Sequence, residues 1–129
     1  MKVYLGGAIN GCTDTECKDW REYAQKILGI ENTLNPMDRD YRSRELKPEI
    51  VNEIVENDKD DICNSTCMLV LYEKPSVGTS MEILYAYMQD ISIYIVDISG
   101  KSLSPWLSYH ASMLFKDLDS ALKYIKGFD

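Results

Sequence analysis

Two short, almost wholly apolar runs, MLVLY (68–72) and ISIYIV (91–96), most constrain the fold of this chain. Both are rich in branched or aromatic side chains, and both have the length of a strand rather than of a buried helix. Runs of this kind are typical of strands in a parallel sheet that is covered on both faces. We therefore expect a central sheet enclosed by helices.

Strand-like and helical patterns alternate along the rest of the chain. Further strands are expected at 2–5, 33–35 and 112–115, and helices at 14–28, 48–62, 81–88 and 117–125. This order predicts an α/β fold with a parallel sheet of about five strands between helices. The charged segment 36–48 is interpreted as a surface loop, and residues 1–129 as a single domain.

Composition narrows the classes of partner. Fourteen basic and 21 acidic residues give a formal net charge of -7, so we expect no general attraction for a nucleic-acid polymer. No apolar run approaches the roughly 20 residues of a membrane helix. The first residues, MKVYLGG, already form a strand-like pattern and do not suggest a signal peptide. We expect a cytoplasmic protein without a membrane partner.

The cysteines do not form a metal motif. Cys12, Cys17, Cys63 and Cys67 lack the Cys-x2-Cys spacing of strong zinc sites, and His110 is the single histidine. We expect no metal site and reduced, mostly buried thiols.

Ligands of parallel α/β sheets gather where strands end, so the loops after the expected strands matter most. Glu82 follows one such loop and stands in a helical pattern that is apolar nearly all round, so we expect this helix to be buried on nearly every side. Burial raises a carboxyl pKa, whereas a place in the first helical turn lowers it and preserves the anion. Position alone leaves open a catalytic carboxylate or a helix-dipole acid beside a cap at Thr79 or Ser80.

Two other residues bear on that choice. Tyr4 lies in the first expected strand, where its hydroxyl could emerge at the same edge, and Asp58 lies in the helix before the run 68–72. Each also has a simpler interpretation, Tyr4 as a core aromatic and Asp58 as one member of a solvated acidic run, NDKDD.

Four segments together resemble the nucleoside 2-deoxyribosyltransferase family, namely VYLGGAING, ENDKDDICNSTCMLVLY, VGTSMEILYAY and PWLSYHASMLFKDLDSAL. Their most specific element is G-x-x-x-E-x-x-x-A, preceded at a fixed distance by Asp and at the start of the chain by Y-L-G-G. The resemblance spans nearly the whole chain. It implies a flavodoxin-like three-layer sandwich with a five-stranded parallel sheet, small-molecule nucleoside, nucleotide and nucleobase partners, and no cofactor.

The resemblance also implies residue roles. Glu82 matches the nucleophile that attacks the anomeric carbon, Tyr4 the residue that orients it, and Asp58 the acid that handles the base. Such a carboxylate stabilises an oxocarbenium-like state and can form a covalent glycosyl-enzyme, while a protonated acid assists departure of the base. The implied substrate-binding positions are Gly6, Gly7, Asn10, Ser76, Gly78 and Ser104.

The acceptor of the sugar is less constrained. The transferases usually carry an acid where this chain has Ser76, whereas related hydrolases of deoxynucleoside 5′-monophosphates have a serine there. Those hydrolases take a second serine, matched by Ser104, from a neighbouring subunit, so a homo-oligomer of two or more copies is expected. They also have a serine and an arginine where this chain has Ala8 and Asn10.

Arg39, Arg42 or Arg44 could supply the missing phosphate-binding charge, or could simply face solvent. Many of the transferases have a longer tail that reaches an adjacent active site, whereas this sequence ends soon after its last expected helix. By comparison with that family we expect a more open site, in which water competes as acceptor. We expect base transfer first, monophosphate hydrolysis second, and a non-catalytic nucleotide-binding module as the alternative from another class.

Overall fold

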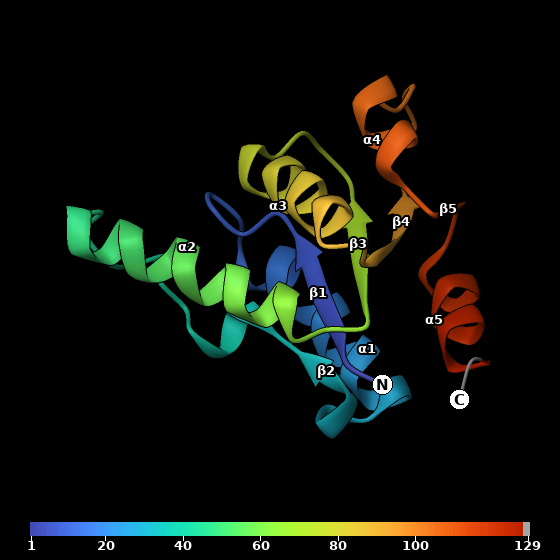
Figure 1. The fold of residues 1–129 in the computed structure, drawn as a ribbon, viewed down its shortest axis with the longest axis horizontal. Coiled ribbons are helices and arrows are strands. Elements are labelled where there is room, and N and C mark those ends of the chain that lie inside the picture. Colours follow the sequence, from blue (N-terminus) through green and yellow to red (C-terminus); the bar gives the residue numbers. More distant parts are fainter. Residues whose placement is uncertain (128–129) are drawn as a thin grey trace.

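Five strands form one all-parallel sheet in the computed structural model, which describes residues 1–127 (Figure 1). The spatial order is β2-β1-β3-β4-β5. The strands are β1 (Val3–Gly7), β2 (Thr33–Leu34), β3 (Cys67–Tyr72), β4 (Ser92–Asp97) and β5 (Met113–Phe115). The two apolar runs are thus the neighbouring strands β3 and β4, as their composition predicted.

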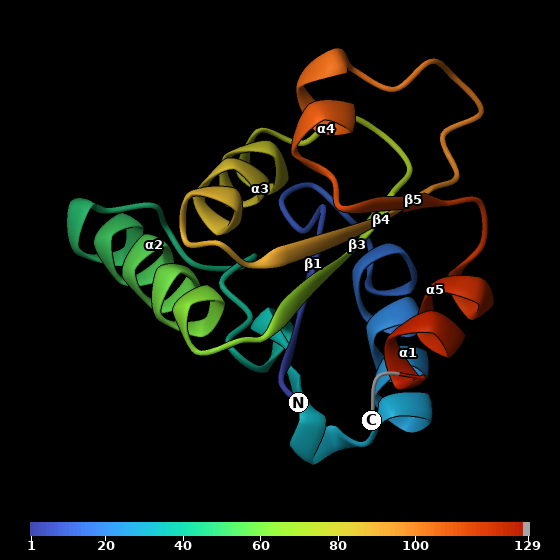
Figure 2. The same cartoon turned by 45° about the vertical axis from the view of Figure 1, so that its right-hand side comes forward.

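Helices cover both faces of the sheet, which confirms the predicted three-layer α/β sandwich. They are α1 (Trp20–Leu28), α2 (Pro48–Cys63), α3 (Val77–Met88), α4 (Pro105–His110) and α5 (Leu118–Lys126). Helices α1 and α5 lie on one face, and α2, α3 and α4 on the other (Figure 2). A π-helical turn, Thr15–Asp19, leads into α1, and short 3-10 turns, Ile30–Asn32 and Pro36–Asp38, flank β2.

The alternation of side chains along β1 divides the core into two parts. Val3 and Leu5 pack with apolar residues of α1 and α5. Tyr4 points to the opposite face, where it packs with Ile62 of α2 and Ile83 of α3. The aromatic ring of Tyr4 therefore enters the layer that also contains the expected catalytic helix.

Two helix boundaries differ from the prediction. Helix α3 begins at Val77, four residues earlier than expected, because Ser76, rather than Thr79 or Ser80, is its N-cap and its Oγ accepts a hydrogen bond from the Thr79 amide at 3.3 Å. Helix α4 is not among the expected helices, and begins with Pro105 directly after its cap, Ser104. In the segment predicted to be a surface loop, Pro36 and Met37 are buried.

The expectation that α3 is buried nearly all round is wrong. Met81 is 68 % exposed and Met88 70 % exposed, because no other element within residues 1–127 covers this side of α3. Trp106 of α4 is 71 % exposed, although a tryptophan in an apolar stretch is more often a core residue. Cys63 is also exposed, whereas the other three thiols are buried.

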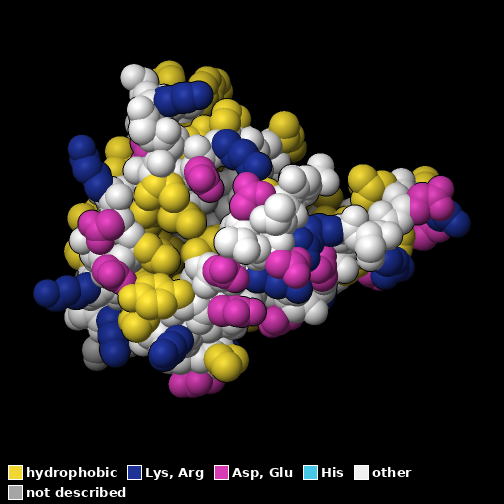
Figure 3. All heavy atoms as spheres, turned by 180° about the vertical axis from the view of Figure 1, so that it is seen from behind, with side chains coloured by type: hydrophobic (Ala, Val, Ile, Leu, Met, Phe, Trp, Pro, Cys, Tyr) yellow, Lys and Arg dark blue, Asp and Glu magenta, His cyan; other side chains and the backbone are white. Residues whose placement is uncertain are grey.

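The surface carries charges of both signs. On the side opposite to that of Figure 1, acidic and basic side chains are interspersed around a band of apolar ones, and the beginning of α2 projects from the body (Figure 3). Within residues 1–127, no helix is long and apolar enough to span a membrane.

Candidate active site

Three side chains from three elements meet on the face of the sheet that α2 and α3 cover. Tyr4 comes from β1, Asp58 from α2 and Glu82 from α3. The Tyr4 hydroxyl donates a hydrogen bond to Glu82 Oε2 at 2.5 Å. The Asp58 carboxyl lies beside the Glu82 carboxyl and raises its pKa. Residues that are 78 positions apart in the sequence, Tyr4 and Glu82, thus touch in the fold.

Local structure explains why Asp58 turns inward. It precedes the buried Ile62 of α2 by four residues, which places both on one side of the helix. The Asp58 side chain is 27 % exposed, whereas its neighbour Asp60 lies on the exposed side of α2. Asp58 is therefore not simply one member of a solvated acidic run.

Burial prevails over the helix start in setting the charge state of Glu82, a choice that its position in the sequence left open. Burial raises the pKa of Glu82 to about 8, and the neighbouring Asp58 raises it too, while the Tyr4 hydroxyl and the buried Arg21 act in the opposite direction. Because α3 begins at Val77, Glu82 lies in the second turn, beyond the free backbone N–H groups of the helix start.

Asp58 has its own set of charged neighbours. Burial raises its pKa to about 6, Arg39 lowers it and Asp61 raises it. Arg39 Nη2 lies 3.6 Å from Asp58 Oδ1 and 2.6 Å from Asp61 Oδ2. Since Asp58 and Glu82 interact, protons leave the pair in two steps, and near neutral pH the pair holds one proton.

Tyr4 is a permanent hydrogen-bond donor. Burial and the charges of Glu82 and Asp58 raise the pKa of its phenol far above the usual range, so the hydroxyl keeps its proton. One Glu82 oxygen, Oε2, is therefore held by Tyr4.

The glycines at the end of β1 have no side chain, so neighbouring side chains can pack directly against the strand backbone. A Cβ on Gly6 would lie 2.4 Å from Met68 Cε, and a Cβ on Gly7 would lie 3.0 Å from Trp20 Cζ2. Asn10 follows in the exposed turn after the strand.

The other expected binding positions lie at helix starts. Ser76 caps α3, and Gly78 lies in its first turn with open space where a side chain would project. Ser104 is exposed and caps α4, with its Oγ accepting from the Trp106 amide at 3.2 Å. The structure does not join Ser104 to the contacts of Tyr4, Asp58 and Glu82.

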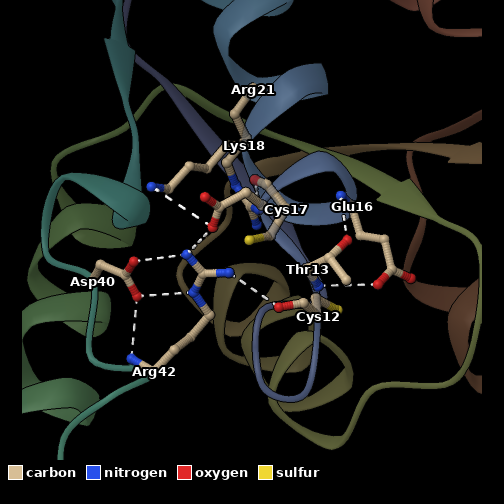
Figure 4. Close-up of polar contacts among 9 residues, drawn as sticks. Cys12, Thr13, Glu16, Cys17, Lys18, Arg21, Asp40 and Arg42 are labelled. Atoms are coloured by element: carbon tan, nitrogen blue, oxygen red, sulfur yellow. Dashed lines mark hydrogen bonds and ion pairs between the residues drawn. The ribbon is translucent and has the colours of Figure 1, made fainter.

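Two of the three arginines considered for phosphate binding pair with carboxylates. Arg39 pairs with Asp61, as described above. Arg42 donates to both oxygens of Asp40, to Asp14 and to the Cys12 carbonyl, and so ties the loop after β1 to the loop after β2 (Figure 4). Arg44 lies on the exposed surface of the same segment.

Two hollows lie outside this cluster. An open hollow of about 490 Å³ lies along the beginning of α2, and a small one of about 20 Å³ lies near the ends of β1 and β3. Neither hollow is lined by Tyr4, Asp58 or Glu82. The candidate site is therefore defined by the contacts among these three side chains.

Sequence reasoning did not identify Arg39 as the partner of Asp58 and did not consider Arg21 at all. The pairing of Arg39 depends on how the segment after β2 crosses α2, and no local pattern shows this. Arg21 did leave a signal, because it shares the apolar side of α1 with Ala24 and Leu28, three and seven residues later.

No protein-family model matches the chain, and no curated protein sequence matches it. Solved structures do. A 2-deoxyribosyltransferase from Bacillus psychrosaccharolyticus aligns with a TM-score of 0.77 at 15 % identity, over 100 % of this chain and 93 % of that one. The CMP N-glycosidase BcmB of Clostridium botulinum aligns with a TM-score of 0.63 at 15 % identity, over 97 % and 98 %. The chain therefore has the same α/β fold as a 2-deoxyribosyltransferase and a CMP N-glycosidase.

Proposed function

We propose that this protein cleaves the N-glycosidic bond of 2′-deoxynucleosides through a covalent deoxyribosyl intermediate on Glu82 and transfers the sugar to another nucleobase. The hydrogen bond from Tyr4 to Glu82, with Asp58 beside it, is the observation that carries this proposal. A nucleophile held by a fixed donor next to a second carboxyl group suits displacement at a sugar carbon. The names of the two structural neighbours support a reaction at this bond.

The first half of the reaction releases the base. The reactive form of the pair has its charge on Glu82 and its proton on Asp58. The Glu82 oxygen that Tyr4 does not hold attacks C1′, while the electrons of the C1′–N bond leave with the base and Asp58 gives that base a proton. Positive charge that develops on the sugar is stabilised by the Glu82 carboxylate.

The second half regenerates the enzyme. Asp58, now ionised, accepts a proton from the incoming base, whose nitrogen attacks C1′ and displaces Glu82. If water attacks instead, the same steps give hydrolysis. The acceptor is thus set by what reaches C1′ rather than by a different catalytic group.

A second candidate is hydrolysis of deoxynucleoside 5′-monophosphates. It is supported by Ser76, which places a neutral hydroxyl at the start of α3, six residues before Glu82, where an acid would repel phosphate. In either reaction we propose that a second copy of the chain completes the site with Ser104. The exposed apolar residues Met81 and Trp106, on the helices α3 and α4, support such an interface.

Chromatography of mixtures tests these alternatives. The protein is incubated with deoxyadenosine or its 5′-monophosphate, with and without cytosine. New deoxycytidine supports the transferase, free adenine from the monophosphate alone supports the hydrolase, and unchanged mixtures support a nucleotide-binding module.

The nucleophile is tested by Glu82→Ala, with Glu56→Ala on the exposed side of α2 as control. We expect Glu82→Ala to abolish cleavage and to retain the fold, and Glu56→Ala to behave as the unmodified protein. Near-normal turnover by Glu82→Ala would contradict the mechanism.

A further inference from the structure

Arg21 of α1 is fully buried, with 0 % of its surface exposed. Its guanidinium donates three hydrogen bonds, from Nε to the Leu5 carbonyl at 3.0 Å, from Nη2 to the Gly7 carbonyl at 3.0 Å and from Nη1 to the Cys17 carbonyl at 2.6 Å. It also lies 4.7 Å from the centre of the Trp20 ring. The three hydrogen bonds thus go to backbone oxygens rather than to carboxylates.

The position of these carbonyls explains why Arg21 is needed as a hydrogen-bond donor at the end of β1. Strand β2 pairs with β1 only at Val3 and Tyr4, whereas β3 pairs with β1 as far as Gly7. Carbonyls two residues apart in a strand point to the same side, and two arginine nitrogens reach those of Leu5 and Gly7. Arg21 therefore takes the place of the strand residues that β2 does not supply.

The buried charge of Arg21 requires a second explanation. Placing an ion in a protein interior is costly unless it is hydrogen-bonded and close to opposite charge. Across β1 from Arg21 lies the acidic pair of Glu82 and Asp58, whose charges and that of Arg21 attract one another. Glu82 faces Tyr4 from β1, Asp58 from α2 and Arg21 from α1, while Asp58 also faces Arg39 and Asp61.

We propose that Arg21 is a positioning residue of the active site, which fixes the end of β1 that bears Tyr4, Gly6 and Gly7 and supplies the buried positive charge that balances Glu82 and Asp58. This proposal rests on the proposed function for its effect on turnover. The contacts of Arg21 with β1 do not depend on that function.

Two variants separate the role of the charge from that of the hydrogen bonds. Arg21→Met removes both and keeps much of the side-chain length. Arg21→Lys keeps a charge but lacks the planar fork that spans two carbonyls. Lys26→Met, on the exposed side of the same helix, is the control and should behave as the unmodified protein.

For Arg21→Met we expect both limbs of the profile of kcat/KM against pH to move to higher pH by about one unit. A unit charge roughly 10 Å away in an interior of effective dielectric about 20 produces a shift of this order. For Arg21→Lys we expect limbs close to those of the unmodified protein, with kcat/KM at least about tenfold lower because the end of β1 is no longer held in place.

A measurement without turnover distinguishes failure of this proposal from failure of the proposed function. The Glu82 carboxyl is titrated by carbon-13 NMR, with its signal assigned by its loss in Glu82→Gln. In folded Arg21→Met its midpoint should rise by the same one unit even if the protein cleaves nothing.

An unchanged midpoint in folded Arg21→Met would overturn the role of the charge. Unchanged kcat/KM in Arg21→Lys, in a protein that does turn over, would overturn the role of the hydrogen bonds. If Arg21→Met does not fold, Arg21→Lys still decides the second point.

Discussion

The hydrogen bond between Tyr4 and Glu82 gives the sharpest test of the site. Tyr4→Phe removes one hydroxyl and leaves a ring of nearly the same shape in a position that is 1 % exposed, so the packing around it is retained. The hydroxyl donates to the charged form of Glu82 and thereby lowers its pKa. Its loss must raise that pKa above the present value of about 8.

The magnitude follows from the type of bond. Hydrogen bonds to charged groups contribute about 1.5–3 kcal/mol, which corresponds to about one to two pKa units. The reactive form, with Glu82 ionised and Asp58 protonated, loses the same stabilisation. At neutral pH we therefore expect kcat/KM to fall about 10- to 150-fold, as that free energy implies.

The assay is the rate of base release across the pH range. The alkaline limb of the profile of kcat/KM against pH is governed mainly by Glu82 and should move up by about one to two pH units on loss of the hydrogen bond. The acidic limb is governed mainly by Asp58 and should move little. Tyr94→Phe is the matched control, because Tyr94 is buried on the other face of the sheet. An unmoved alkaline limb in folded Tyr4→Phe, or an equal loss in Tyr94→Phe, would refute this reasoning.

Three other changes test the surroundings of the site. Arg39→Met removes the cation that favours ionised Asp58, so the pKa of Asp58 should rise above about 6 and the acidic limb should move to higher pH. Ser76→Asp should keep α3 intact, since Asp also caps helices. It should lower kcat/KM for monophosphates more than for nucleosides. Equal effects on both substrates would exclude a phosphate near Ser76. Met81→Lys should reduce the mass measured by light scattering while circular dichroism shows the chain still folded, and an unchanged mass would place Met81 outside the subunit interface.

The strands were predictable because their pattern has few alternatives. An apolar run such as 68–72 must be covered on both faces, and the alternating helices supply that cover. The sequence gives weaker signals for helix boundaries than for strands. Thr79, Ser80 and Ser76 are all acceptable caps, and only the chain path after β3 selects Ser76. Helix α4 has six residues, too few for a helical period to show in the sequence.

The members of the candidate site were expected from the sequence, whereas their electrostatics were not. Tyr4, Asp58 and Glu82 were identified through a family resemblance, and the fold brings them together. The sequence left the direction of the Glu82 pKa open, because that direction depends on where α3 starts. The pairing of Arg39 with Asp58 depends on the packing of two distant segments, which no spacing in the sequence specifies.

Strand β1 connects the face that carries Glu82 with the face that carries Arg21, because its alternate residues serve opposite faces of the sheet. Tyr4 reaches Glu82 on one face, while the carbonyls of Leu5 and Gly7 are held by Arg21 from the other. A substitution in α1 that displaces Arg21 should therefore alter the environment of Glu82 without touching substrate. The short strand β2 makes this arrangement necessary, since a longer β2 would itself hold those carbonyls and leave a buried guanidinium there without a structural role.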